Sequence, residues 1–130
     1  MFNHSISRGR LLQVFCAIGV FFVLPLLAFG VSASSYRAIT AVELKALLQK
    51  EDVFLLDVHI PEQKHIPGTD AFIDYRKIRE NKDLLPTDKT TRIVVYCRSG
   101  NMSHKAALDL IDLGYSHVFD LIGGTRAFGP

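Results

Sequence analysis

Two short apolar runs, almost free of polar residues, place the tightest limits on how this chain folds. Residues 53–58 read VFLLDV, with a single acid, and residues 92–96 read RIVVY. Runs of this length that do not alternate between apolar and polar residues are typical of strands buried on both faces. They therefore predict the centre of a parallel sheet.

Helical patterns alternate with these runs, which favours an α/β fold with helices on both faces of the sheet. Thr40 and Glu43 fit a capping box at the start of a helix over 41–50. The other predicted elements are a linker or first strand within 34–38, a loop over 59–69, a strand at 71–73, a short helix at 75–81, a helix at 103–113 ended by Gly114, and a strand at 118–122. Ligands of such sheets bind beyond the carboxyl ends of the strands.

The first 33 residues differ from the rest and are excluded from the fold. Residues 11–29 form a charge-free apolar stretch, which as a helix would span about 28 Å, close to the thickness of the hydrocarbon core. Its length favours an uncleaved membrane anchor, whereas the small residues ending at Ala33 also suit cleavage of an exported protein. We therefore expect a hydrophobic amino-terminal helix over 1–33 and a separate domain over 36–130.

Charge supports this division. Arg8 and Arg10 precede the apolar stretch, and the remaining 13 Lys and Arg residues balance 13 Asp and Glu residues. Basic residues before the stretch favour a cytoplasmic amino terminus and a domain outside the cytoplasmic membrane, in the periplasm. The neutral remainder gives no indication of nucleic-acid binding.

The cysteine count then draws attention to one loop. Cys16 lies in the apolar stretch and Cys97 in the domain, so the chain is not a disulfide scaffold. Cys97 ends the run 92–96 and opens the segment CRSGNMS, which leads into the helix at 103–113. A lone cysteine is commonly just a small buried apolar residue, but its place at a strand end favours a functional site.

The segment after Cys97 is suited to holding an anion. Gly100 permits a backbone conformation closed to other residues, and the helix that follows begins with unpaired amide groups. These amides, the positive end of the helix and the guanidinium of Arg98 would stabilise a thiolate. The segment therefore predicts a Cys97 thiol with a lowered pKa.

CRSGNMS, with RIVVY before it and LIGG near the end of the chain, resembles the active-site half of a single-domain rhodanese. LLDVHIPEQKHIPGTDAFI resembles the first signature of that family. The resemblance covers residues 36–128 and implies a sulfurtransferase with a rhodanese-like fold. It implies that Cys97 takes a sulfur atom from a donor such as thiosulfate, forms a persulfide, and passes the sulfur to cyanide or a thiol.

The resemblance also implies the rest of the site. The residues expected to cradle the persulfide are Arg98, Ser99, Gly100, Asn101, Met102 and Ser103. Neither a metal nor an organic cofactor is required. The membrane, through residues 11–29, is the other expected partner. Many family members have arginine at the position of Met102 and also at the position of His59, after Asp-Val. They also have a tryptophan and a longer helix after Gly-Gly. This chain lacks that tryptophan, and its closing helix is expected to be short.

Two other functions fit parts of the pattern. A cysteine phosphatase shares the strand, cysteine loop and helix, but it needs an arginine six positions after the cysteine, where this chain has Ser103. A binding or redox-sensing module that keeps the fold without transferring sulfur is the alternative from a different class, and Met102 and His59 favour it. Turnover distinguishes this module from a sulfurtransferase, because only the enzyme passes the persulfide sulfur to an acceptor.

Several polar residues outside the loop have structural interpretations. Asp57 is expected to bond loop amides, and His65 to fix the loop. His59 and His65 lack the neighbouring ligands of a metal site. His104 and Arg126 are expected to be exposed.

Overall fold

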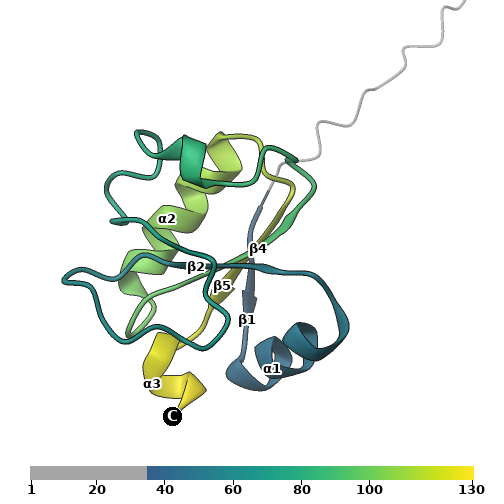
Figure 1. The fold of residues 1–130 in the computed structure, drawn as a ribbon, viewed down its shortest axis with the longest axis vertical. Helices are drawn as coiled ribbons and strands as arrows, with labels where there is room; N and C mark the ends of the chain where they lie inside the picture. The colour runs from purple at the N-terminus through teal and green to yellow at the C-terminus, as the bar shows by residue number, and fades with distance from the viewer. Residues whose placement is uncertain (1–34) are drawn as a thin grey trace, which may run out of the picture. The chain divides into compact units, whose positions relative to one another are not determined.

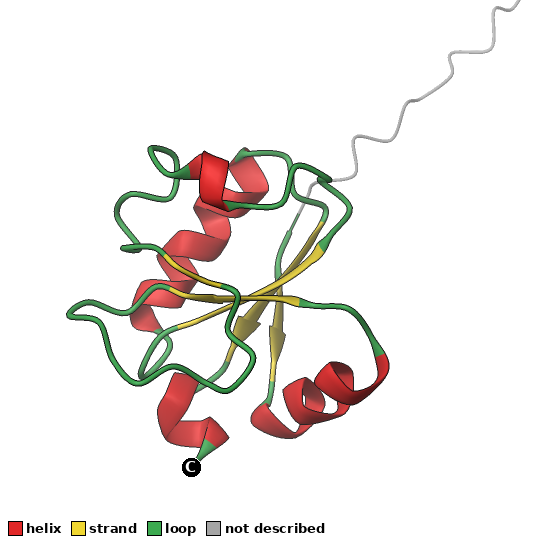
Figure 2. Ribbon diagram, in the orientation of Figure 1, coloured by secondary structure: helices red, strands yellow, loops and turns green. Residues whose placement is uncertain are grey.

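The computed structural model describes residues 35–130, which form a sheet with helices packed on both faces (Figure 1). The elements in chain order are β1 (Arg37–Ile39), α1 (Ala41–Lys50), β2 (Phe54–Asp57), β3 (Ala71–Phe72), the short 3-10 helix η1 (Lys82–Leu84), β4 (Arg92–Tyr96), α2 (Asn101–Asp112), β5 (His117–Leu121) and α3 (Gly124–Phe128). The alternation of strands and helices predicted from the sequence is confirmed except between β3 and β4, where only η1 is present (Figure 2).

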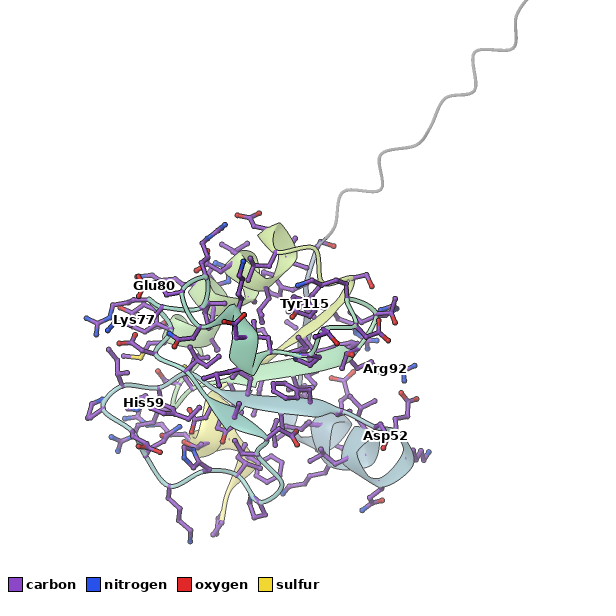
Figure 3. The ribbon with its side chains drawn as sticks, turned by 45° about the horizontal axis from the view of Figure 1, so that its top comes forward. Asp52, His59, Lys77, Glu80, Arg92 and Tyr115 are labelled. Atoms are coloured by element: carbon purple, nitrogen blue, oxygen red, sulfur yellow. The ribbon has the colours of Figure 1, made fainter. Side chains whose placement is uncertain are left out.

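All five strands are parallel, in the order β1-β5-β4-β2-β3. The two apolar runs supply β2 and β4, which are neighbours near the middle of the sheet, with Leu56 opposite Val95. Because the strands are parallel, their carboxyl ends lie at one edge. Figure 3 shows this polarity, with Arg92 at the start of β4 and His59 beyond the end of β2 on opposite sides of the domain.

The lack of alternation in the apolar runs has the predicted cause, burial on both faces. Leu56 and Val95 belong to the core beneath α2, whereas Leu55 and Val94 belong to the core beneath α1 and α3. Successive side chains of a strand point to opposite faces, so each face requires its own apolar residues. Figure 1 shows α2 on one side of the sheet and α1 with α3 on the other.

The predicted ends of the helices and strands are mostly within two residues of the observed ones. The capping box of α1 is present, with the Thr40 hydroxyl accepting from the Glu43 amide at 3.2 Å and Glu43 accepting from the Thr40 amide at 2.7 Å. The helix α2 begins at Asn101, earlier than predicted, and ends just before Gly114, which has φ of 93°. The residues at 59–69 form a loop, as predicted.

The prediction of a helix at 75–81 is wrong. This segment forms turns, followed by η1. The Asp74 carboxylate accepts from the Arg76 amide at 2.9 Å and binds its guanidinium at 2.6 Å. An aspartate that bonds the backbone two residues ahead favours a turn over a continuing helix.

The apolar segment predicted as a membrane anchor or signal, residues 11–29, and the boundary near Ala33 lie outside the described residues. Within residues 35–130, no helix combines the length and the apolar character needed to cross a membrane.

Candidate active site

Cys97 lies directly after β4, at the edge of the sheet where the strands end, and its side chain is buried with 1% exposure. Only three residues separate it from α2. Gly100, the residue before α2, has φ of 108°, a conformation that favours glycine. The glycine therefore turns the chain sharply enough for the loop to fold back over the cysteine.

The loop surrounds the cysteine sulfur with hydrogen-bonding groups. The Gly100 amide donates to Cys97 Sγ at 3.0 Å. The thiol in turn donates to Ser103 Oγ at 3.6 Å, and the Ser103 hydroxyl donates to the Gly100 carbonyl at 3.1 Å. The sulfur, the hydroxyl and the backbone of Gly100 thus form one connected network.

These contacts act against the effect of burial on the thiol. Burial raises the pKa of Cys97, but hydrogen bonding with the Ser103 side chain and with the amides of Ser103, Gly100 and Ser99 lowers it more, so the pKa lies below its usual value. Hydrogen bonds to a charged form favour that form. The arrangement therefore favours a thiolate, as expected from the sequence, although the Arg98 side chain is exposed and the main contributions come from the serines and glycine.

The last helix holds the loop by its backbone. The Thr125 amide donates to the Cys97 carbonyl at 2.9 Å, and the Arg126 amide donates to the Arg98 carbonyl at 3.2 Å. Gly124 makes this approach possible, because a Cβ there would lie 2.2 Å from the Cys97 carbonyl oxygen. The side chain of Arg126 is exposed, as expected.

A second polar cluster lies at the end of the neighbouring strand β2. Asp57 is completely buried and accepts from the His59 amide at 3.0 Å and from Gln63 Nε2 at 3.3 Å. His65 contacts Asp57 at 2.8 Å and Glu62 at 2.9 Å. Hydrogen bonding to Asp57 raises the pKa of His65, against the opposing effect of burial. The expected structural roles of Asp57 and His65 agree with these contacts.

The two clusters are joined through side chains. Gln63 accepts from the Thr125 hydroxyl at 3.3 Å. This hydrogen bond connects the loop after β2 to α3, the helix whose amides bind the cysteine loop. Tyr96, the residue before Cys97, accepts from the Ile66 amide at 3.0 Å, and burial raises the pKa of this tyrosine to about 12. The loop after β2 is therefore anchored beside the cysteine.

The predicted site residues differ in how they lie around the Cys97 sulfur. Gly100, Ser103 and the Ser99 amide act on Cys97 directly. The side chains of Arg98 and Asn101 are exposed, and Met102 is half-buried against the core beneath α2. Among residues 35–130, no group of three or more His, Cys, Asp or Glu side chains is arranged so that it could hold a metal ion.

Three residues around the site were not predicted from the sequence. Gln63 and Gly124 connect the loops, and Asp120 lies buried on β5 close to Ser103. The pair Gly123 and Gly124, where the last helix begins, was a usable signal, because glycine at such a position marks a close backbone approach. Nothing in the sequence distinguishes Asp120 from an exposed aspartate.

A parallel sheet with a buried cysteine at the end of its central strand, covered by backbone amides, defines an α/β protein with a candidate cysteine nucleophile. Residues 40–129 match the model of the rhodanese-like domain family. The chain belongs to this family.

Several known proteins are similar to this chain. The thiosulfate sulfurtransferase GlpE of Coxiella burnetii is 30% identical over 92 residues, which cover 68% of this chain and 83% of the relative. The thiosulfate sulfurtransferase PspE of Escherichia coli is 33% identical over 66 residues, covering 48% of this chain and 62% of the relative. The crystal structure of a rhodanese-like domain protein from Staphylococcus aureus has a TM-score of 0.63 and 27% identity, and covers 72% of this chain and 91% of that one.

Proposed function

We propose that this protein is a sulfurtransferase that carries sulfur as a persulfide on Cys97. The Cys97 thiolate attacks the outer sulfur of a donor such as thiosulfate. A sulfur–sulfur bond forms to Cys97 while the bond between the outer sulfur and the sulfite group breaks, and sulfite leaves with the bonding electron pair. A thiol or cyanide acceptor then takes the outer sulfur and returns Cys97 to the thiolate.

The observation that carries this proposal is the set of donors directed at the Cys97 sulfur. The Gly100 amide lies 3.0 Å from Sγ, and hydrogen bonds lower the pKa of the thiol despite its burial. A thiolate is the reactive form of cysteine, and fixed amide dipoles stabilise negative charge without reorganising during the reaction. Two easy transfers then replace one difficult transfer.

Similarity to two thiosulfate sulfurtransferases supports thiosulfate as the donor. Two features limit which donors suit the site. Cys97 is only 1% exposed, which favours a small donor, and the half-buried Met102 brings no positive charge to attract an anion. The exposed guanidinium of Arg98 is the cation of the loop itself.

The location of the protein is a separate part of the proposal. The charge-free residues 11–29, with Arg8 and Arg10 before them, support a domain that is anchored to the cytoplasmic membrane and lies on its outer side. Release into the periplasm after cleavage near Ala33 is the other outcome that this sequence allows.

Intact-mass measurement of the full chain with and without thiosulfate tests the function. We expect the mass of one sulfur atom to be added to the wild type, mapped to the Cys97 peptide, and none to be added to Cys97→Ser. Cys16→Ser is the matched control and should load as the wild type does. Absence of added sulfur on the wild type, or equal addition to Cys97→Ser, would contradict thiosulfate as donor to Cys97.

A further inference from the structure

A cavity of about 450 Å³ lies where the loop after β2 meets α3. Its wall is formed by residues 63–67 of the loop and by Thr125, Arg126, Gly129 and Pro130. Neither Cys97 nor the segment 98–103 lines it, so the cavity is separate from the groups that bind the cysteine sulfur. Proteins commonly bind small ligands in cavities of about 300–1,000 Å³.

The wall of this cavity carries basic side chains and no acidic one. Lys64 and Arg126 are both exposed, and among residues 35–130 neither is paired with an acidic group. His65, the third basic residue of the wall, is already bound to Asp57 at 2.8 Å and to Glu62 at 2.9 Å. Lys64 and Arg126 therefore leave an uncompensated positive charge at the cavity, which favours an anionic ligand.

The rest of the wall is suited to a short carbon chain. Ile66, Pro67 and Pro130 supply apolar surface to the same cavity. A bare inorganic anion has no apolar part to place against these side chains, whereas a small organic acid has one. A guanidinium group also matches the planar carboxylate, to which it can donate two parallel hydrogen bonds. The wall as a whole therefore favours an organic carboxylate.

Two residues of the wall also hold the cysteine loop. The amides of Thr125 and Arg126 donate to the carbonyl oxygens of Cys97 and Arg98 at 2.9 and 3.2 Å, while both residues line the cavity. Gln63, on the opposite wall, accepts from the Thr125 hydroxyl at 3.3 Å. A ligand in the cavity would therefore lie against the same residues that fix the position of the nucleophile.

We propose that this cavity binds the carboxylate groups of the sulfur acceptor, a small organic thiol, with Lys64 and Arg126 as the binding residues. The inference rests on the proposed function, because it names the class of acceptor for the persulfide on Cys97. A thiol that carries carboxylates combines an anion for the two cations with a sulfur atom that can accept the transferred sulfur.

The transfer step balances without a further reactant. The acceptor thiol loses its proton to water, and its thiolate attacks the outer sulfur of the persulfide. A sulfur–sulfur bond forms to the acceptor while the bond between the outer sulfur and Cys97 breaks. The Cys97 sulfur keeps the bonding electron pair and leaves as a thiolate, to which the Gly100 amide donates at 3.0 Å. No oxidant or reductant is consumed.

The first test measures binding to the full chain without any sulfur chemistry. The probe is S-methyl mercaptosuccinate, which has two carboxylates and no free thiol, and the readout is acetylation of Lys64 by acetic anhydride, followed by mass spectrometry. At about 10 mM probe we expect Lys64 to react about threefold more slowly or less, which corresponds to a Kd of about 5 mM or tighter. Lys50, exposed at the end of α1 and outside the cavity, is the internal control and should be unaffected.

Arg126→Gln removes one of the two cations but keeps the amide that binds the Arg98 carbonyl. We expect the protection of Lys64 to fall by roughly half or more in this variant. Equal slowing of Lys64 and Lys50, or none, would overturn the assignment of the cavity as a carboxylate site.

The second test asks whether the ligand is the acceptor. Single-turnover transfer from the sulfur-loaded full chain is measured with mercaptosuccinate and with thioglycerol, an uncharged thiol of similar size. The ratio of the two rate constants should fall about fivefold in Lys64→Gln/Arg126→Gln, because only mercaptosuccinate loses its charge partners. Lys50→Gln/Lys82→Gln removes the same charge outside the cavity and should keep the wild-type ratio.

Thiosulfate loading in the same variants separates the acceptor from the donor. If loading slows as much as transfer to mercaptosuccinate does, the cavity attracts any sulfur-containing anion and the assignment to the acceptor is overturned. An unchanged ratio of the two thiols would overturn it as well. A wild type that takes up no sulfur contradicts the proposed function instead, and the protection of Lys64 still shows whether the cavity binds carboxylates.

Discussion

Gly124 and Cys97 are in backbone contact: a Cβ on Gly124 would lie 2.2 Å from the Cys97 carbonyl oxygen and 2.6 Å from the carbonyl carbon of Arg98. The amides that follow Gly124 donate to the carbonyl oxygens of the same two residues. The last helix therefore fixes the position of the cysteine loop, although it is only five residues long.

Gly124→Ala should disrupt this contact. Neither partner is a flexible side chain, and Gly124 has φ of 55°. We expect a loss of about 2–4 kcal/mol in the free energy of unfolding, from overpacking and left-handed strain together, together with slower alkylation of Cys97. The control is Gly114→Ala, where φ is 93° but no atom lies within 4 Å of the added Cβ. Equal losses in the two variants, measured by urea unfolding, would contradict the importance of the contact.

The pKa of Cys97 should lie below the ordinary thiol value of about 8.5. Ser103→Ala removes a side-chain hydrogen bond that lowers this pKa and should raise it. Ser99→Ala is the matched control, because the exposed Ser99 contributes its amide, which the substitution keeps. The rate of Cys97 alkylation as a function of pH gives the pKa of Cys97 in each variant. This pKa must be higher in Ser103→Ala than in both Ser99→Ala and the wild type.

His65 should stabilise the fold more at low pH than at high pH. Its pKa is raised in the folded protein by hydrogen bonding to Asp57, so its contribution is fully present below about pH 6.5, the usual range of the unfolded histidine. The contribution is lost as the pH rises through the pKa of folded His65. Tm measured across pH should show a gap between the wild type and His65→Gln that narrows as pH rises. A gap that stays constant or widens as the pH rises would contradict the stabilising role of the contact between His65 and Asp57.

Met102→Arg should improve loading from thiosulfate. Met102 lies in the first turn of α2 and brings no charge to the loop that covers Cys97. A cation several ångströms from an anionic donor contributes ~1–4 kcal/mol, depending on the effective dielectric, so we expect loading to become about tenfold faster. Met102→Gln, which is of similar length and uncharged, is the control. Loading that is equally fast in both variants would show that charge at this position does not matter.

The amino-terminal segment is tested by sequencing the mature protein. If residues 11–29 remain as an anchor, the protein should fractionate with the membrane and retain its first residues. A mature chain that begins at Ser34 would contradict the anchor and favour an exported domain.

The sequence predicted the central part of this fold well because the strands are marked by local composition. Residues 54–57 and 92–96 carry apolar side chains for two faces, a pattern typical of strands buried on both sides. The helix predicted at 75–81 failed because Asp74 bonds to Arg76 and favours a turn. Such competition between side chain and backbone depends on geometry that apolar periodicity does not report.

In the candidate site, too, some residues could be predicted from the sequence and others could not. Cys97, Gly100 and Ser103 were predicted because a strand end, a glycine and a helix start follow each other in the sequence. Asp120 and Gln63 are distant in sequence from Cys97, and only the sheet order and the loop path bring them near. The role expected of the Arg98 guanidinium was inferred from its neighbourhood in sequence, and it stays a prediction; the residue is exposed.

The most direct test of the account is single-turnover transfer from the sulfur-loaded full chain to cyanide, with thiocyanate and the mass of Cys97 followed together. We predict that thiocyanate appears at the rate at which the extra sulfur leaves Cys97, with one thiocyanate for each persulfide, and that the released thiol can be loaded again. A persulfide that forms on Cys97 but is passed to neither cyanide nor a thiol would contradict sulfur transfer, and would assign this loop to sensing or binding instead.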